Sequence, residues 1–315
     1  MKKILSIIIV NIFILAFMFA IYEFICFRRE AKELSENFKA VNQFWKDKGV
    51  TTDDVIKAEY RLTQKLTLEN LNEKLQVYEG NNPQKRPVVF IGCSFAEGLE
   101  IEPEERIPSL VAEETGRTTY NLGVAATSIN WFYKRLQMEG DKSDYNNPEY
   151  FIYIYISDHI RRLFAFETLM YIENTRYKIK DDKLAEERSI INHLYSLYSI
   201  KQLARRIETS ERDRELQQGY PLFNKLIEES KKVVEEKYDN PKFVLLDYPQ
   251  KNNNTRLPEE EIKKLEEMGV IYLSAEDLFG HDISDDQSYW AGDNIHPSAK
   301  AWAELTPKLI KKLSL

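Results

Sequence analysis

Short apolar runs alternate with longer amphipathic stretches over most of the chain. Each run is rich in β-branched or aromatic residues and ends at turn-forming residues, which is typical of strands buried on both faces of a sheet. The five runs are residues 87–92, 118–124, 150–156, 242–248 and 270–273. Because helix-forming stretches separate them, the pattern predicts an α/β domain with five parallel strands and helices on both faces.

The interval between the third and fourth predicted strands is much longer than a crossover requires. Residues 161–238 are mostly charged and helix-forming, whereas a crossover needs about a dozen residues. We therefore expect a helical insertion, which is either a surface hairpin of helices or a cap over the carboxyl ends of the strands. A last helix is predicted over 298–313, with Pro297 in its first turn.

The N-terminus carries the strongest local signal. Lys2 and Lys3 precede an apolar stretch, 4–27, which is long enough to cross a bilayer as a helix. A cleaved signal peptide and a buried core helix are the alternatives, but no small-x-small cleavage site precedes Arg28. We therefore expect an uncleaved transmembrane helix. Basic residues flank both of its ends, so charge alone does not decide its orientation.

The region after this segment is rich in Glu, Lys, Leu and Gln, which predicts charged helices from Arg28 to about Tyr78. These helices form either a stalk or a layer packed on the domain. A turn-rich segment, 80–87, then marks a boundary. The predicted organisation is a membrane anchor over 1–27, a helical segment over 28–84 and an α/β domain over 85–315.

Charge and cysteine content narrow the function. The net charge of −7 disfavours a nucleic-acid partner, which would require a clustered excess of Lys and Arg. The two cysteines, Cys26 and Cys93, form no CxxC pair, so the sequence contains no zinc or redox motif of that type.

Three segments carry candidate chemistry. One of them, 121–129, begins at the end of the second predicted strand, where Gly123 can bring its N–H toward Ser94 as an oxyanion donor or can form an ordinary strand-end turn. Ser94 follows the first predicted strand between Gly92 and Gly98, although Ala96 departs from the G-x-S-x-G elbow. A serine in such a place is, by itself, more often an ordinary turn residue.

Near the other end of the chain, Asp293 lies three residues before His296. A catalytic histidine needs an acceptor on its second ring nitrogen, and this spacing in a loop can supply one. Taken alone, the pair also fits a helix cap or a metal site.

The joint order of motifs resembles the SGNH (GDSL-like) hydrolases. The motifs are Gly-x-Ser-x-x-x-Gly, Asn-x-Gly and Asp-x-x-His-Pro at residues 92–98, 121–123 and 293–297. The resemblance implies a three-layer flavodoxin-like fold with strand order 2-1-3-4-5 and no cofactor or metal. It also implies that Ser94 is the nucleophile, His296 the general base and Asp293 the residue that orients it.

The resemblance further implies an oxyanion hole that includes the N–H groups of Ser94 and Gly123. The chain departs from the family at two positions. Cys93 replaces the usual Asp before the serine, and we interpret it as a small buried neighbour. Ser157 stands where the family has an Asn whose amide donates to the oxyanion, and a hydroxyl reaches less far.

The segment after the third strand also borders the predicted site. Asp158, His159 and Arg161 are candidate substrate-binding residues, since an arginine can bind an anionic group and His159 is a rival for the base. The alternative is a helix N-terminus capped by Ser157 or Asp158 with solvated arginines, which suits Arg162 better.

Together these features predict a membrane-anchored serine esterase that hydrolyses an O-acyl ester through an acyl-enzyme. The expected substrate is an acylated small molecule, envelope glycan or lipid, with the catalytic domain outside the cytoplasm. Two alternatives stay open: an O-acyltransferase with the same triad, and a non-catalytic carbohydrate-binding or assembly protein that retains the fold.

Overall fold

The computed structural model describes residues 21–22, 75–137, 145–163, 177–186, 219–251 and 256–315. The chain divides into two compact units, 1–63 with 188–211 and 64–187 with 212–315. Of the first unit only residues 21–22, which are helical, are described. Apart from residues 21–22, the predicted anchor lies outside the described residues, as does the predicted helical segment up to residue 74. Within the described ranges, no helix combines the length and hydropathy needed to cross a bilayer.

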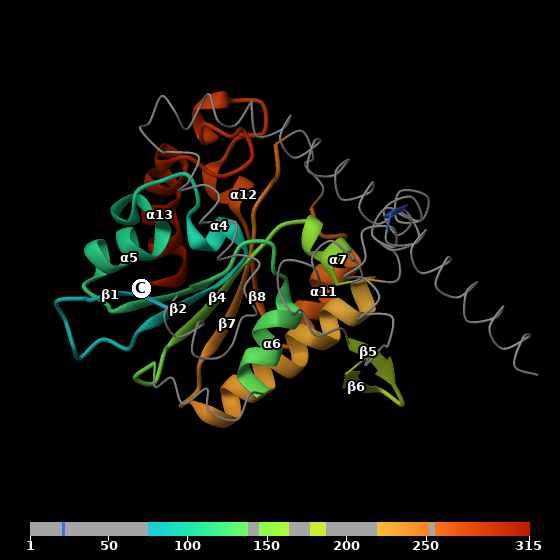
Figure 1. Cartoon of the computed structure of the whole chain (residues 1–315). Coiled ribbons are helices and arrows are strands. Elements are labelled where there is room, and N and C mark those ends of the chain that lie inside the picture. The colour runs from blue at the N-terminus through green and yellow to red at the C-terminus, as the bar shows by residue number, and fades with distance from the viewer. Residues whose placement is uncertain (1–20, 23–74, 138–144, 164–176, 187–218, 252–255) are drawn as a thin grey trace, which may run out of the picture. The chain divides into compact units, whose positions relative to one another are not determined.

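The second unit is built on a mixed sheet (Figure 1). Its six strands are β1 (Gln76–Tyr78), β2 (Val88–Gly92), β3 (Thr119–Gly123), β4 (Tyr150–Tyr155), β7 (Lys242–Asp247) and β8 (Ile271–Ser274). They are ordered β1-β3-β2-β4-β7-β8, and all neighbours are parallel except β1 and β3. The five predicted strands thus have the predicted order, 2-1-3-4-5. The sheet fits the SGNH-like fold that the motifs implied.

The edge strand β1 corrects the sequence interpretation. We predicted charged helices as far as Tyr78, but Gln76–Tyr78 pairs antiparallel with β3. The side chain of Gln76 accepts hydrogen bonds from Asn121 and Arg106, at 3.2 and 2.9 Å. Partners 30 and 45 residues away, rather than local propensity, therefore hold this strand in place.

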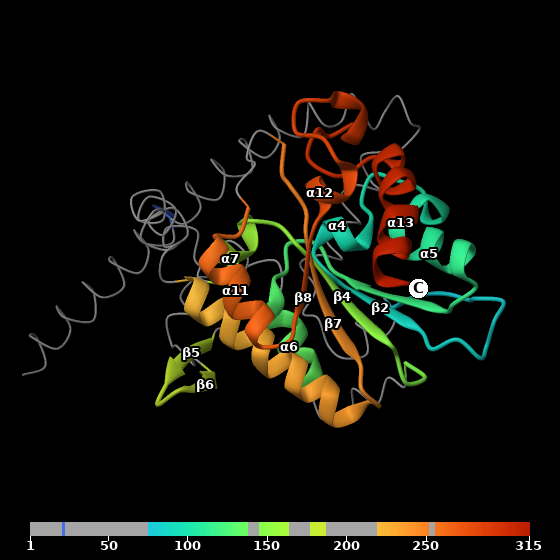
Figure 2. The same cartoon turned by 180° about the vertical axis from the view of Figure 1, so that it is seen from behind.

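Helices cover both faces of the sheet (Figures 1 and 2). The described helices are α4 (Ser94–Glu97), α5 (Ile107–Thr115), α6 (Ile129–Gln137), α7 (Asp158–Arg162), the helix 219–237, α11 (Glu259–Glu267), α12 (Ala275–Phe279) and α13 (Ala299–Leu313), with 3-10 turns η1 (Pro103–Glu105) and η2 (Gln287–Tyr289). Side chains alternate along each strand between two cores. One core includes residues of α6, the helix 219–237 and α11, and the other includes residues of α5, α12 and α13.

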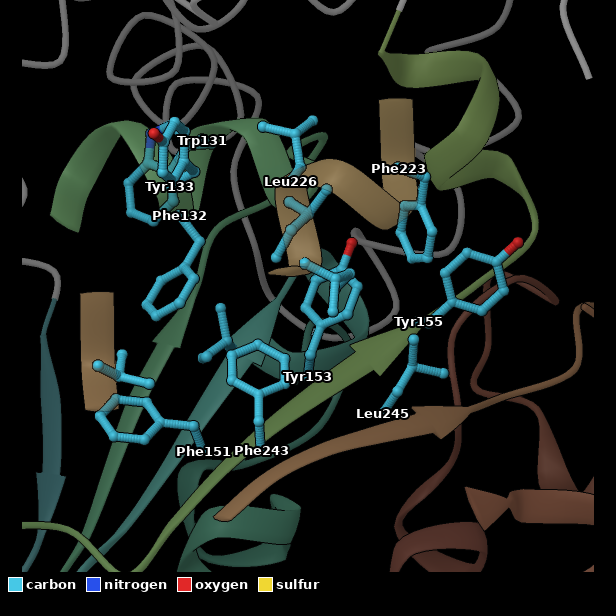
Figure 3. Packing of buried hydrophobic residues seen from close by; sticks show 14 of the residues in the cluster. Trp131, Phe132, Tyr133, Phe151, Tyr153, Tyr155, Phe223, Leu226, Phe243 and Leu245 are labelled. Atoms are coloured by element: carbon cyan, nitrogen blue, oxygen red, sulfur yellow. The ribbon is translucent and has the colours of Figure 1, made fainter. Parts of the chain in front are cut away.

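The first of these cores is strongly aromatic (Figure 3). Tyr153 and Tyr155 of β4 point toward Phe223 on the helix 219–237, with ring centroids 6.2 and 5.1 Å away. Each fully buried aromatic or aliphatic side chain contributes about 1.5–3 kcal/mol of transfer free energy. The helix 219–237, within the predicted insertion 161–238, is therefore a layer of the core. Residues 164–176 and 187–218 of the insertion lie outside the described ranges, so the cap stays a prediction.

A small hairpin also lies within the predicted helical insertion. Strands β5 (Tyr177–Lys180) and β6 (Lys183–Glu186) pair antiparallel across Asp181 and Asp182. Both aspartates have positive φ, +50° and +60°, as a type I′ turn requires. Lys, Glu and Leu favour helix on average, but this turn selects a hairpin.

The last helix begins slightly later than predicted. Ser298 is its N-cap, with Oγ accepting from the N–H of Ala301 at 3.3 Å. Pro297 precedes the cap and pairs with Trp290 in an isolated β-bridge. The bridge anchors the loop that leads into α13.

Candidate active site

Ser94 lies on a sharp turn at the carboxyl end of the central strand β2. Gly92 has φ +151°, and a Cβ there would lie 2.8 Å from the carbonyl oxygen of Ile154. A side chain at this position would clash with the neighbouring strand, so glycine is required. Ser94 is the first residue of α4, so its N–H has no partner within the helix. The residue is 6% exposed.

The structure brings Ser94 and His296 together from positions 202 residues apart. Ser94 Oγ lies 2.8 Å from His296 Nε2, and His296 Nδ1 is hydrogen-bonded to Asp293 Oδ2. Because a carboxylate only accepts, Nδ1 carries the proton and Nε2 is left to accept from the Ser94 hydroxyl. The three predicted catalytic side chains thus form one continuous hydrogen-bonded chain.

Asp293 is fixed by its own loop. Its Oδ1 accepts from the N–H groups of Ile295 and His296, at 2.9 and 3.0 Å. Burial alone would raise the pKa of this carboxyl, but the hydrogen bonds and charge of His296 outweigh burial and lower it. Asp293 therefore remains a carboxylate at neutral pH.

The Gly123 prediction needs correction. Its N–H, expected in the oxyanion hole, donates to Asn121 Oδ1 at 2.9 Å. Asn side chains commonly bond to the backbone two residues on, which explains this contact. Gly123 has a different role, because a Cβ there would lie 2.2 Å from the N–H nitrogen of Glu97. The glycine lets the end of β3 approach α4 closely.

The following loop offers a donor that the sequence did not indicate. Val124 N–H donates to Gly92 O at 3.0 Å, and Ala125 N–H donates to Glu97 Oε2 at 2.7 Å, so the loop lies against the Ser94 turn. Ala126 has φ +61°, unusual for a residue with a side chain. Its N–H makes no hydrogen bond with any residue described. Only the backbone conformation reveals this donor.

Ser157, at the position where the SGNH hydrolases have an Asn, is hydrogen-bonded to a second side chain. Its Oγ donates to Gln250 Oε1 at 2.7 Å, and the same oxygen accepts from Asp158 N–H at 3.3 Å. Gln250 follows β7 and was not singled out from the sequence.

The predicted substrate-binding cluster is largely internal. Asp158 pairs with Arg161 and Arg162, with Nε–Oδ distances of 2.7 Å in both cases. Burial alone would raise the pKa of Asp158, but the two guanidinium groups outweigh it and lower the pKa. Arg162 is mostly buried, not solvated as expected, and also donates to Thr127 O at 3.1 Å. Arg161 pairs with Asp158 while 34% of its side chain stays exposed, so its role in substrate binding stays a prediction.

His159 is excluded from the site surface. It is completely buried, and its Nδ1 pairs with Tyr153 Oη at 2.7 Å. Burial, followed by the charge of Arg162, places its pKa well below the usual value, so the ring is neutral. The structure therefore corrects the prediction that His159 binds substrate or competes with His296.

Cys93 is buried beside the nucleophile, as expected. Its side chain is fully buried, and its sulfur lies 3.9 Å from Ser94 Oγ. In the part of the chain that the structure describes, no three His, Cys, Asp or Glu residues are grouped so as to hold a metal ion. The arrangement of Ser94, His296 and Asp293 is that of a nucleophile, a base and an orienting carboxylate.

No protein-family model matches this chain, and no curated protein matches it. Solved structures that match include one described as a lipolytic protein of the G-D-S-L family from Desulfitobacterium hafniense DCB-2 (12% identity, TM-score 0.41, covering 72% of this chain and 99% of that chain). An acetylxylan esterase from Geobacillus stearothermophilus, a catalytic mutant, matches at 11% identity and TM-score 0.42, covering 75% of this chain and 97% of that chain. A member of the lipolytic G-D-S-L family from Veillonella parvula DSM 2008 matches at 8% identity and TM-score 0.42, covering 73% and 99%. At these identities and TM-scores the likenesses carry no argument about activity, so the function of this chain is inferred from its own residues.

Proposed function

We propose that this protein is a serine esterase that cleaves an O-acyl ester through a covalent acyl-enzyme. One observation carries the proposal: Ser94 Oγ, the His296 ring and Asp293 are linked in a single hydrogen-bonded chain. A turn serine or a helix-capping Asp-His pair would not need this contact across 202 residues.

In the proposed reaction, His296 Nε2 takes the proton of the Ser94 hydroxyl as the oxygen attacks the ester carbonyl. The imidazolium then protonates the leaving alcohol, and the acyl group stays on Ser94. Water, deprotonated by the same nitrogen, attacks the acyl carbon, the bond to Ser94 Oγ breaks, and the imidazolium returns its proton to Oγ as the acid leaves. Asp293 holds the tautomer and stabilises the imidazolium.

The tetrahedral intermediate needs donors for its negative oxygen. We propose the N–H groups of Ser94 and Ala126 as backbone donors. Their support is that neither N–H has a partner among the described residues, and that the loop carrying Ala126 is hydrogen-bonded to Gly92 and Glu97 on either side of Ser94.

We further propose that the substrate is an acylated envelope glycan or lipid, reached from outside the cytoplasm by a domain anchored through residues 1–27. The support is the apolar N-terminal stretch in the sequence. Fractionation of cells expressing the full chain, followed by protease accessibility of the domain, tests the location. A soluble or cytoplasm-facing domain would overturn it.

The test of the activity is intact-mass detection of a fluorophosphonate adduct on Ser94. We expect labelling of the wild type, none in Ser94→Ala and very slow labelling in His296→Ala. Incubation with acetylated or fatty-acylated glycans should then release free acid in the wild type only. Transfer of the acyl group to an added sugar would indicate an acyltransferase, and an unlabelled wild type would contradict the proposal.

A further inference from the structure

We propose that the side-chain amide of Gln250 is the third oxyanion donor of this site. The inference rests on the proposed function, because the donor acts on the tetrahedral intermediate formed at Ser94. It concerns a residue that lies on neither the Ser94 turn nor the His296 loop.

The orientation of the Gln250 amide follows from its partners. Its Oε1 receives the Ser157 hydroxyl at 2.7 Å and the Asp158 N–H at 3.3 Å. A backbone N–H can only donate, so the oxygen of the amide must face Asp158. The amide nitrogen therefore points away from both donors. It has no hydrogen-bond partner in the portion of the chain that the structure covers.

The chain on either side of Gln250 contacts the site. Two residues earlier, the ring of Tyr248 packs edge-on against Phe95, with centroids 5.7 Å apart, and Phe95 lies 5.4 Å from the His296 ring. One residue later, Lys251 Nζ donates to Asn294 Oδ1 at 2.9 Å, in the loop that carries His296. Gln250 thus lies in a segment that borders both the nucleophile turn and the histidine loop.

Two of the predicted donors, the Gly123 N–H and the Ser157 hydroxyl, are already used. Gly123 N–H donates to Asn121, and the Ser157 hydroxyl proton is directed to Gln250. Since β4 and β7 are neighbours in the sheet, a side chain that follows β7 can serve where one following β4 is too short. Ser157 would then be a positioning residue that holds the amide oxygen, leaving two N–H donors for the substrate.

Two variants separate a donor from a structural bridge. Gln250→Glu keeps an oxygen that accepts from Ser157 and Asp158 but has no N–H, whereas Gln250→Met has similar length and neither group. For a small acetyl ester, loss of one oxyanion donor lowers kcat by about 100-fold or more with little change in KM, and we expect this of both variants. Phosphonylation of Ser94 should slow in parallel, because its transition state also develops charge on oxygen. Gln84→Met, an exposed residue before β2, is the matched control.

The outcomes are distinct. Normal rates in both variants would overturn the inference while leaving Ser94 chemistry intact. A slow Gln250→Glu variant beside a normal Gln250→Met variant would show an effect of the added charge only, and would also overturn the inference. A normal Glu variant with a slow Met variant would indicate a bridge, not a donor. If wild-type Ser94 neither reacts nor hydrolyses esters, the proposed function fails and the inference fails with it. Should the Gln250 variants not fold, Ser157→Ala must lower kcat measurably at unchanged KM, and an unchanged kcat would overturn the inference.

Discussion

Two histidines lie near the carboxyl edge of the same sheet, and the fold treats them in opposite ways. The ring of His296 has an acceptor on one nitrogen and the Ser94 hydroxyl on the other, with 13% of its side chain exposed. His159 is fully buried, with Tyr153 on one nitrogen and no described partner on the other. The polar neighbours of His159 are likewise bonded to each other, as Asp158 with Arg162 illustrates.

The difference separates a reactive cluster from a structural one. Proton transfer requires an imidazole nitrogen that contacts a group reacting with substrate, as His296 Nε2 contacts Ser94 Oγ. The buried ring of His159 contributes only packing and a hydrogen bond. Both clusters contain His, Asp and a hydroxyl group. Their residue types therefore do not distinguish them, but their partners do.

The largest expected loss of activity comes from a substitution in the reactive cluster of Ser94, His296 and Asp293. His296→Ala should lower kcat for ester hydrolysis on the order of 10⁵–10⁶-fold, because Ser94 loses its base. His159→Gln, measured in the same assay on folded protein, should change kcat little. If both substitutions abolish activity at unchanged stability, the distinction between the two histidines is wrong.

Asp293→Asn should have the next largest effect. The amide can stabilise the wrong tautomer of His296, and the loss in kcat is expected to be about 10³–10⁴-fold with KM nearly unchanged. Thermal unfolding should be close to that of the wild type, since Asn keeps an oxygen for the Ile295 and His296 N–H groups. A kcat within tenfold of wild type would show that Asp293 is only a loop residue.

In the structural cluster, Arg162→Met should lower the free energy of unfolding by about 3 kcal/mol, because Asp158 loses a buried partner and Thr127 O loses a donor. Arg161→Met is the matched control, since this guanidinium pairs with the same carboxylate but is more exposed, and a loss within about 1 kcal/mol is expected. Urea unfolding measures both. Equal losses would mean that burial does not distinguish the two pairs.

The pH dependence of stability should report the buried histidine. The pKa of His159 is lowered in the folded state, so its stabilising contribution is present above the unfolded value near 6.5 and is lost as the pH falls below it. Between pH 7 and pH 5 the wild type should lose about 2 kcal/mol relative to His159→Gln. Urea unfolding at several pH values checks this. Parallel curves would show that His159 protonates freely when folded.

The smallest effect is expected at the residue between the two clusters. Cys93→Ala removes a buried sulfur and should lower the free energy of unfolding by about 1–2 kcal/mol, with phosphonylation of Ser94 retained. Loss of labelling in a fully folded Cys93→Ala protein would instead implicate the thiol in the chemistry.

Several features could be predicted from the sequence because their signals are local. The apolar runs that became β2, β3, β4 and β7 are buried on both faces, so composition alone marks them, whereas β8 is only partly buried. Ser94, Asp293 and His296 were identified because three local motifs, taken in their order along the chain, resemble those of the SGNH hydrolases. Two of these motifs begin at the ends of predicted strands, and the carboxyl ends of parallel strands meet at one edge of the sheet.

Other features depended on distant contacts. Strand β1 is held by side chains 30 and 45 residues away. The Gly123 N–H donates to the side chain of Asn121, which is the first residue of the Asn-x-Gly motif itself. Ala126 was missed because its signal is a backbone angle, and Gln250 because its partners lie 92 and 93 residues earlier.

The sequence by itself determined the five buried strands, the turn after the first of them and the Asp-His pair, since each follows from a short-range pattern. The strand order and the catalytic roles came from the resemblance of the joined motifs to the SGNH hydrolases. Only the tertiary structure decided that His159 is buried against Tyr153, that Asp158 pairs with Arg162, and that Gln250 meets Ser157. Burial and hydrogen-bond pairing are set by whichever groups the fold brings close, and no local pattern specifies these neighbours.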